Sequence, residues 1–148
     1  MSKAHGLAAS LASVRDAADR LNKMTDRAAE TVRRVEEFLG ERCSVGVTAS
    51  VLVSEEDAQD FPTTWTTNLA YAWTNNGLRI VVSVYSEHDG RTDVKTWAEC
   101  SRDVKLATVK KLPDLLTAIA DEINKRISDA EDAIGTIDEV FNALKTGQ

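Results

Sequence analysis

The stretch of sequence that decides the fold runs from residue 69 to residue 85 and reads LAYAWTNNGLRIVVSVY. Two runs with apolar residues at every second position flank the triplet Asn75-Asn76-Gly77, and Asn-Gly is the strongest short signal for a two-residue hairpin turn. A turn at Asn76-Gly77 sets the pairing of the two runs: Trp73 opposes Ile80, Tyr71 opposes Val82 and Leu69 opposes Val84. The pattern predicts a β-hairpin with one apolar face.

Two further strands are predicted on either side of this hairpin. Residues 44–53 alternate between apolar and small or polar side chains except at Leu52, and the apolar face consists of Val45, Val47, Ala49, Val51 and Val53. We expect a second turn around His88-Asp89-Gly90 and a fourth strand at about residues 93–99. Ser101 is a suitable N-cap for a short helix that ends near Lys110. The middle of the chain therefore predicts an antiparallel meander, closed by a short helix.

The segments on either side of this β head carry apolar seams with the spacing of a coiled coil. In the first arm, steps of four and three residues connect Leu7, Leu11, Val14, Ala18, Leu21, Thr25, Ala28, Val32, Val35 and Leu39. The second arm has Pro113 in its first turn and a seam of Leu112, Leu116, Ile119, Ile123, Ile127, Ala130, Ile134, Ile137, Phe141 and Leu144. Gly40 is expected to end the first helix.

The two seams match when one arm is folded back on the other as an antiparallel pair. Facing residue numbers then add up to 151 or 152, from Leu39 with Leu112 near the head to Leu7 with Leu144 at the tips. Opposite charges also meet in this register: Arg20 with Glu131, Lys23 with Asp129 and Asp26 with Lys125. Helices of this length overhang a strand of about 17–20 Å, so we expect the arms to pair with each other. The alternative is that each helix packs on the sheet alone.

The predicted fold class is therefore α+β. A long antiparallel, coiled-coil-like helical hairpin carries a three- to four-stranded antiparallel meander inserted between its two helices, plus a short helix. We expect a single domain over residues 1–148. It consists of the first arm (1–40), the β head (41–100), the short helix (101–111) and the second arm (112–148).

The positions beside the seams are uncharged where a two-stranded coiled coil places charges. They include Ala17, Met24, Phe38, Leu115, Ala133 and Val140. Uncharged flanks predict that a third or fourth helix covers them. We expect a second copy of the chain, which would form a four-helix bundle, or another subunit. The protein is thus predicted to be a homodimer or part of a hetero-oligomer.

Composition excludes several classes of partner. The 148 residues carry 18 Lys and Arg against 24 Asp and Glu, a net charge of −6, which disfavours direct binding to nucleic acid. The sequence contains no run of about 18 apolar residues that would span a membrane. The first ten residues lack the apolar core of a secretory signal, so we expect a cytoplasmic protein.

The sequence shows no group of residues with catalytic or metal-binding spacing. His5 and His88 have no predicted partner, and the seven glycines form no phosphate-binding loop. Cys43 and Cys100 flank the β head without a CxxC motif. We expect two reduced thiols, or, if the head brings them together, a redox bridge or a shared metal. We predict no catalytic residue, no resident metal, no cofactor and no enzymatic activity.

The candidate partner-binding residues lie in the head. Glu55, Glu56, Asp57 and Asp60 form an acidic stretch without the spacing of a calcium loop, and it is either a solvated loop or a contact for a basic partner. Phe61, Trp65 and Trp97 are the aromatic candidates, which either pack over the sheet or contact a partner.

We expect a non-enzymatic interaction protein, an adaptor or accessory subunit, that oligomerises through its arms and presents the acidic, aromatic head to a macromolecule. An inhibitor that occupies the basic groove of a nucleic-acid enzyme is a variant of this hypothesis. The outline of a helical hairpin with strands between its arms resembles prefoldin. That resemblance of architecture implies a chaperone-like assembly factor. A third alternative is a head that binds a small molecule in a pocket under residues 54–68.

Overall fold

Four strands form one antiparallel sheet in the order β1-β2-β3-β4, as the predicted meander requires. The computed structural model describes residues 2–44, 46–57 and 63–147. The strands are β1 (Ala49–Asp57), β2 (Thr64–Thr74), β3 (Gly77–Ser86) and β4 (Arg91–Thr96). β1 therefore begins later than predicted and continues through the acidic residues, with a shift of register between Leu52 and Ser54. Val45 lies outside the described residues.

The hairpin between β2 and β3 is centred one residue earlier than the Asn-Gly signal predicts. Thr74 pairs with Gly77, so that Asn75 and Asn76 form the turn and Tyr71 opposes Ile80. Gly77 has a φ of 89° and neither asparagine has a positive φ, which is typical of a type I turn followed by a left-handed glycine. The pairing is displaced by two residues, so every side chain keeps its predicted face.

The helices α1 (Ser2–Glu37), α2 (Arg102–Val109) and α3 (Leu112–Thr146) pack on one face of this sheet. Side chains of both layers form the core: Ala28, Val32, Leu39, Leu69, Tyr71, Ile80, Val82, Trp97, Leu112, Leu115 and Ile119. Ser101 is the N-cap of α2 and accepts a hydrogen bond from the Val104 amide, as predicted. A short 3₁₀ turn, η2 (Trp97–Glu99), links β4 to α2.

The first helix does not end at Gly40. It continues as a π-helical turn, η1 (Phe38–Cys43), and ends at Ser44, which has a φ of 40° and donates its amide hydrogen to the Leu39 carbonyl at 3.0 Å. Ser44 thus takes the left-handed position that the sequence assigned to glycine. The widened turn keeps Leu39 buried in the core and lets the chain cross to β1.

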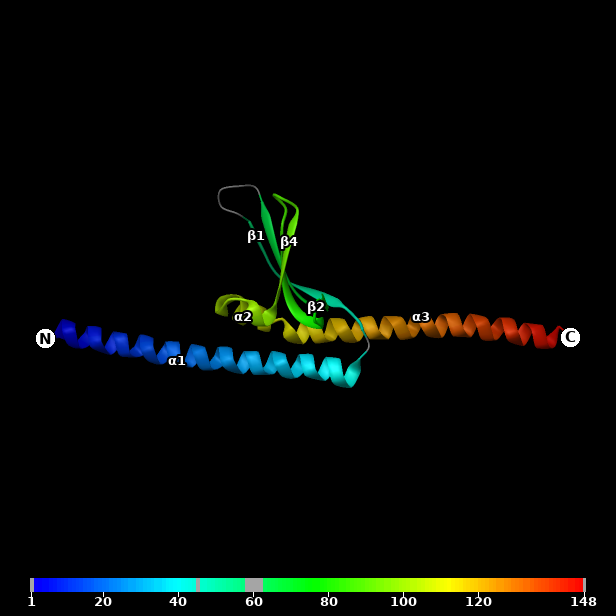
Figure 1. Ribbon diagram of the computed structural model, residues 1–148, viewed down its shortest axis with the longest axis horizontal. Helices are drawn as coiled ribbons and strands as arrows, with labels where there is room; N and C mark the ends of the chain where they lie inside the picture. Colours follow the sequence, from blue (N-terminus) through cyan, green and yellow to red (C-terminus); the bar gives the residue numbers. More distant parts are fainter. Residues whose placement is uncertain (1, 45, 58–62, 148) are drawn as a thin grey trace.

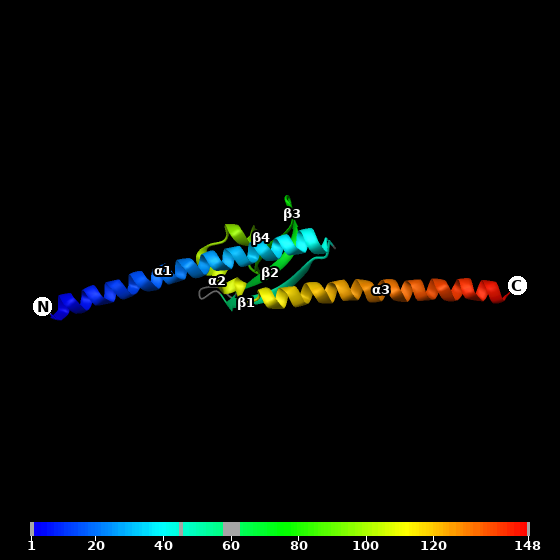
Figure 2. The same cartoon turned by 90° about the horizontal axis from the view of Figure 1, so that it is seen from below.

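The predicted antiparallel hairpin of α1 and α3 is not formed within the chain, and this prediction is wrong for a single copy. Figures 1 and 2 show that both helices run in the same direction along the long axis and leave the head at opposite ends. The N-terminus and the C-terminus therefore lie at opposite ends of an elongated molecule (Figure 1). Each helix packs on the sheet with only about one third of its length, because the apolar face of the head has room for no more.

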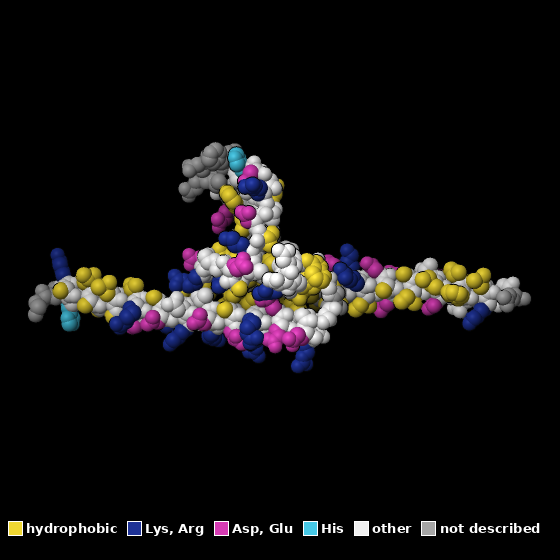
Figure 3. Space-filling model, in the orientation of Figure 1, with side chains coloured by type: hydrophobic (Ala, Val, Ile, Leu, Met, Phe, Trp, Pro, Cys, Tyr) yellow, Lys and Arg dark blue, Asp and Glu magenta, His cyan; other side chains and the backbone are white. Residues whose placement is uncertain are grey.

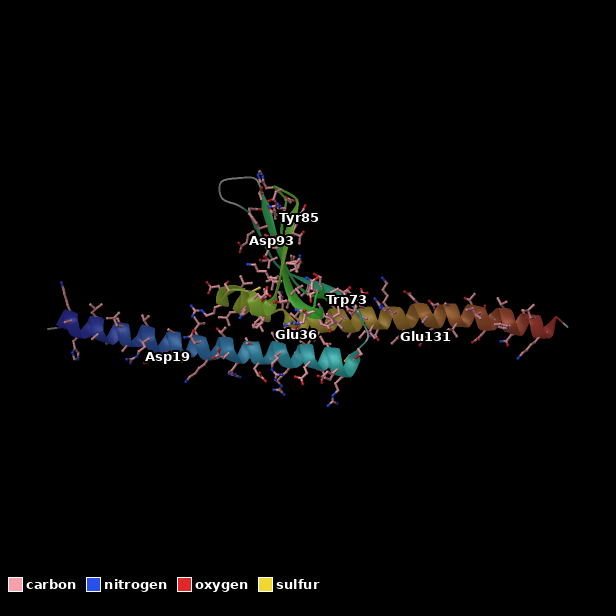
Figure 4. All side chains as sticks on the ribbon, viewed as in Figure 1. Asp19, Glu36, Trp73, Tyr85, Asp93 and Glu131 are labelled. Atoms are coloured by element: carbon pink, nitrogen blue, oxygen red, sulfur yellow. The ribbon has the colours of Figure 1, made fainter. Side chains whose placement is uncertain are left out.

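A carboxylate of α1 fixes the edge of the sheet on this helix. The Glu36 carboxylate of α1 accepts a hydrogen bond from Arg79 Nε at 2.6 Å and one from the Ile80 amide at 3.0 Å. The pairing of β3 with β4 ends at Val81, so the Ile80 amide has no partner on β4. The Glu36 carboxylate accepts the hydrogen bond of this amide instead. The hydrogen bond to Glu36 raises the pKa of Arg79. Figure 4 shows Glu36 between α1 and the base of the sheet, near Trp73.

Candidate interaction surfaces

The arms expose their apolar seams beyond the head. On α1 the large exposed seam residues are Leu7, Leu11, Val14 and Leu21, and on α3 they are Ile127, Ile134, Ile137, Phe141 and Leu144. Leu11 is 62% exposed and Phe141 is 60% exposed. Figure 3 shows hydrophobic side chains along both arms. An exposed apolar stripe of this length is typical of a surface that another chain covers.

The uncharged residues predicted beside the seams divide into two groups. Ala17, Met24, Phe38, Ala133 and Val140 are exposed, so they are available to a further helix. Leu115 is wrong as an interface residue, because it is 0% exposed in the core of its own head. The part of α3 that packs on the sheet turns this flank inward, whereas the arm beyond the head leaves it in solvent.

The predicted charge pairs between the arms do not form within the chain. Figure 4 shows Asp19 on α1 and Glu131 on α3 on opposite sides of the head, so Arg20, next to Asp19, is far from Glu131. Near the head, α2 and not α3 contacts this part of α1. Arg102 of α2 donates a hydrogen bond to Asn22 Oδ1 of α1 at 3.0 Å. The seam of α1 is therefore free from its first turns to about Leu21.

The acidic and aromatic candidates meet at the far end of the sheet. Glu55, Glu56 and Asp57 are exposed at the end of β1, and Glu56 pairs with Trp65 across the β1–β2 ladder. Asp57 accepts a hydrogen bond from Thr64 Oγ1 at 3.1 Å. Trp65 is exposed, so this end of the head carries an aromatic ring beside carboxylates. Asp60 and Phe61 lie outside the described residues.

Trp97 is wrong as a partner-binding residue. It is 2% exposed, its indole Nε1 donates a hydrogen bond to Thr108 Oγ1 at 3.0 Å, and Lys105 Nζ lies 5.3 Å from its ring centroid. The ring fills the space between β4 and α2 and therefore closes the core. Trp73, which the sequence places on the buried face, is instead 66% exposed. It lines an open cavity beside Leu39 and Ile119, and strand alternation alone does not reveal that opening.

Two open cavities of about 270 and 280 Å³ flank the core. The first is apolar and is lined mainly by Leu39, Cys43, Tyr71, Trp73 and Ile119. It lies at the α1 end of the sheet and not under residues 54–68, where the sequence reasoning placed a pocket. The second is lined by Val82, Val84, Asp93 and Cys100, among others.

Two groups that line these cavities have a raised pKa. Burial and the nearby Glu36 carboxylate raise the pKa of Tyr71, and burial raises the pKa of Cys100.

The thiols do not form the predicted alternatives of a bridge or a shared metal. Cys43 and Cys100 are free and line different cavities. In the described part of the chain, no three His, Cys, Asp or Glu residues are grouped to hold a metal ion. Of the helices in residues 2–44, 46–57 and 63–147, none is long and apolar enough to cross a membrane.

Sequence reasoning missed one flank of the seams. Arg15 and Asn22 directly follow seam residues on α1, and Glu131 and Asp138 directly follow seam residues on α3. Three of them, Arg15, Glu131 and Asp138, carry a charge and are called the charged flank below. The signal that identifies them is the heptad position after each second seam residue, where coiled coils place the charges that select a partner.

Comparisons with protein-family models, with curated proteins and with solved structures give no match for this chain.

Proposed function

We propose that this protein is a non-enzymatic interaction protein, an adaptor or accessory subunit, that oligomerises as a coiled coil through its helical arms. The observation that carries this proposal is the exposed apolar seam on each arm, from Leu7 to Leu21 and from Ile127 to Leu144. Burying one such side chain contributes about 1.5–3 kcal/mol. A chain that leaves nine of them in water therefore gains substantially when another helix covers them.

The head is the part that the arms present to a partner. Glu55, Glu56 and Asp57 beside the exposed Trp65 combine negative charge with an aromatic surface, which suits a basic partner protein. The opposite face of the sheet adds the exposed Leu52, Tyr85 and Val94. We place this activity in the cytosol, where two free thiols stay reduced.

The chaperone-like alternative loses its support. It rested on the outline of a helical hairpin with strands between the arms, and the two arms of one chain do not form that hairpin. A small-molecule site finds little support in the apolar cavity beside Cys43, whose lining offers little that would orient a ligand.

The mass of the protein in solution tests the role of the arms. We expect the unmodified chain to sediment above the 16.2 kDa of one copy. Ile137→Asp places a charge in the exposed seam and should shift the protein to the monomer, because a carboxylate in an apolar interface is strongly unfavourable. In the same preparation, Glu56→Lys should leave the mass unchanged and reduce capture of proteins from the native host.

Two matched substitutions serve as controls. Asn142→Asp adds the same charge to α3 away from the seam, and Glu139→Lys makes the same reversal as Glu56→Lys outside the head; both positions are exposed. Neither variant should change the mass or the captured proteins. An unmodified chain that sediments as one copy at every concentration contradicts the proposal, as does capture that Glu56→Lys and Glu139→Lys alter equally.

A further inference from the structure

We infer that the arms are covered by a second copy of this chain, with α1 of each copy packed antiparallel on α3 of the other. This inference rests on the proposed function and names the partner of the seams. It replaces the hairpin within one chain by the same helix pairing between two chains. The result is an arm-exchanged dimer, in which one coiled coil forms on each side of the two heads.

The directions of the helices permit this arrangement with a single two-fold axis. α1 and α3 run in the same direction and leave the head at opposite ends (Figures 1 and 2). A two-fold axis across the long axis of the molecule reverses that direction in the second copy. The α3 arm of the second copy then lies beside the α1 arm of the first, antiparallel to it, and the same contact repeats at the other end. One symmetry operation thus covers both seams, as closed oligomers require.

The lengths and seams of the two arms match each other. The free part of α1, residues 2–21, is about 30 Å long, and the part of α3 beyond Ile123 is about 35 Å long. Five layers can form between copies: Leu7 with Leu144, Leu11 with Phe141, Val14 with Ile137, Ala18 with Ile134 and Leu21 with Ala130. In the last two layers a small residue meets a large one, which fills the space without overpacking.

The head contributes a groove to the helix pair at the end that lies closest to the head. An apolar groove of about 230 Å³ lies where α3 leaves the head, lined by Val47, Ile123, Arg126, Ile127 and Ala130. In the same register the groove receives the partner's Leu21. Each seam therefore continues into a concave part of the other copy's head.

The charged flank selects the exchanged pairing over pairing of like arms. In an antiparallel pair, the flank that follows the seam on one helix faces the same flank on the other. Arg15 of α1 then meets the partner's Asp138, which has the opposite charge. Two α1 arms centred on each other would bring Arg15 against the partner's Arg15. Two α3 arms would bring Glu131 against the partner's Asp138. Like charges in these positions disfavour both alternatives.

Reversal of single charges tests this selection. Arg15→Glu or Asp138→Arg should each weaken the dimer by about tenfold, because every dimer then contains two pairs of like charges. A mixture of the two variants should restore the original affinity and form mainly mixed dimers, in which both pairs are opposite in sign. Asp132→Arg, on the outward side of α3, is the matched control and should leave the affinity unchanged. Equal affinities for all four proteins overturn the inference.

Cross-linking tests which helices meet. One tagged copy carries Val14→Cys and a second, differently tagged copy carries Ile137→Cys, with the parent chain as the control for its own two thiols. Oxidation should join the two different tags through the new cysteines, since a disulfide needs Cα atoms about 4.4–6.8 Å apart. Cross-links between equal positions, in a protein that is still a dimer, overturn the exchange and leave the proposed function standing. A monomer overturns both.

Discussion

At the scale of single residues, the contact between Trp97 and Thr108 decides how the head is closed. Strand patterning locates Trp97 at the end of the head but does not show what covers it, since its cover comes from α2, which folds back over the ring. The same limit applies to Trp73, which is 66% exposed because it lines an open cavity beside the helices. The sequence thus predicts the face of a strand residue better than its burial.

Thr108→Val is expected to lower the free energy of unfolding by about 1–3 kcal/mol. The substitution keeps the shape of the side chain and leaves the buried indole hydrogen of Trp97 without its acceptor. Urea denaturation followed by tryptophan fluorescence measures the change. Thr117→Val is the matched control, because the Thr117 hydroxyl is exposed and donates its hydrogen bond to the Pro113 carbonyl of its own helix. Equal losses in the two variants would show that the indole contact adds no stability.

At the scale of elements, the strands and helices were predictable because each has a strong periodic pattern. The α2 cap at Ser101, the first turn of α3 at Pro113 and the order of the four strands agree with the sequence prediction. The hairpin centre and the end of α1 differ from it. Both depend on a left-handed residue, Gly77 in one case and Ser44 in the other, and the sequence offers several candidates for such positions.

Glu36 is expected to hold α1 against the sheet. Glu36→Ala removes the acceptor of Arg79 and of the Ile80 amide and should lower the free energy of unfolding by about 2 kcal/mol. Glu37→Ala is the matched control, since Glu37 pairs with Arg33 in solvent and should cost less than about 1 kcal/mol. Thermal unfolding of the two variants side by side measures the difference. A smaller loss for Glu36→Ala than for Glu37→Ala would contradict the role of this carboxylate.

At the scale of the whole molecule, the prediction of a hairpin failed for a physical reason. The matching seams predict that an α1 seam packs antiparallel on an α3 seam, and they say nothing about whether both belong to the same copy. The head decides this, because Ala28, Val32, Leu112, Leu115 and Ile119 are buried against the sheet with both helices pointing in the same direction. A periodic pattern therefore fixes which surfaces fit each other, and the connection between them fixes which copy provides each surface.

The arms are expected to lose helical structure on dilution while the head keeps its fold. Beyond the head, the side chains of both arms are exposed, and isolated helices of fewer than about 12–15 residues are marginal in water, with longer ones only modestly better. In the proposed dimer, pairing of the arms would supply the packing that stabilises them. Circular dichroism at 222 nm should therefore weaken as the protein dissociates, whereas the near-ultraviolet signal of the buried Trp97 should persist. Ile137→Asp should show the diluted spectrum at every concentration. A helical signal that stays constant through dissociation, measured in parallel by sedimentation, would mean that the arms are stable without a partner.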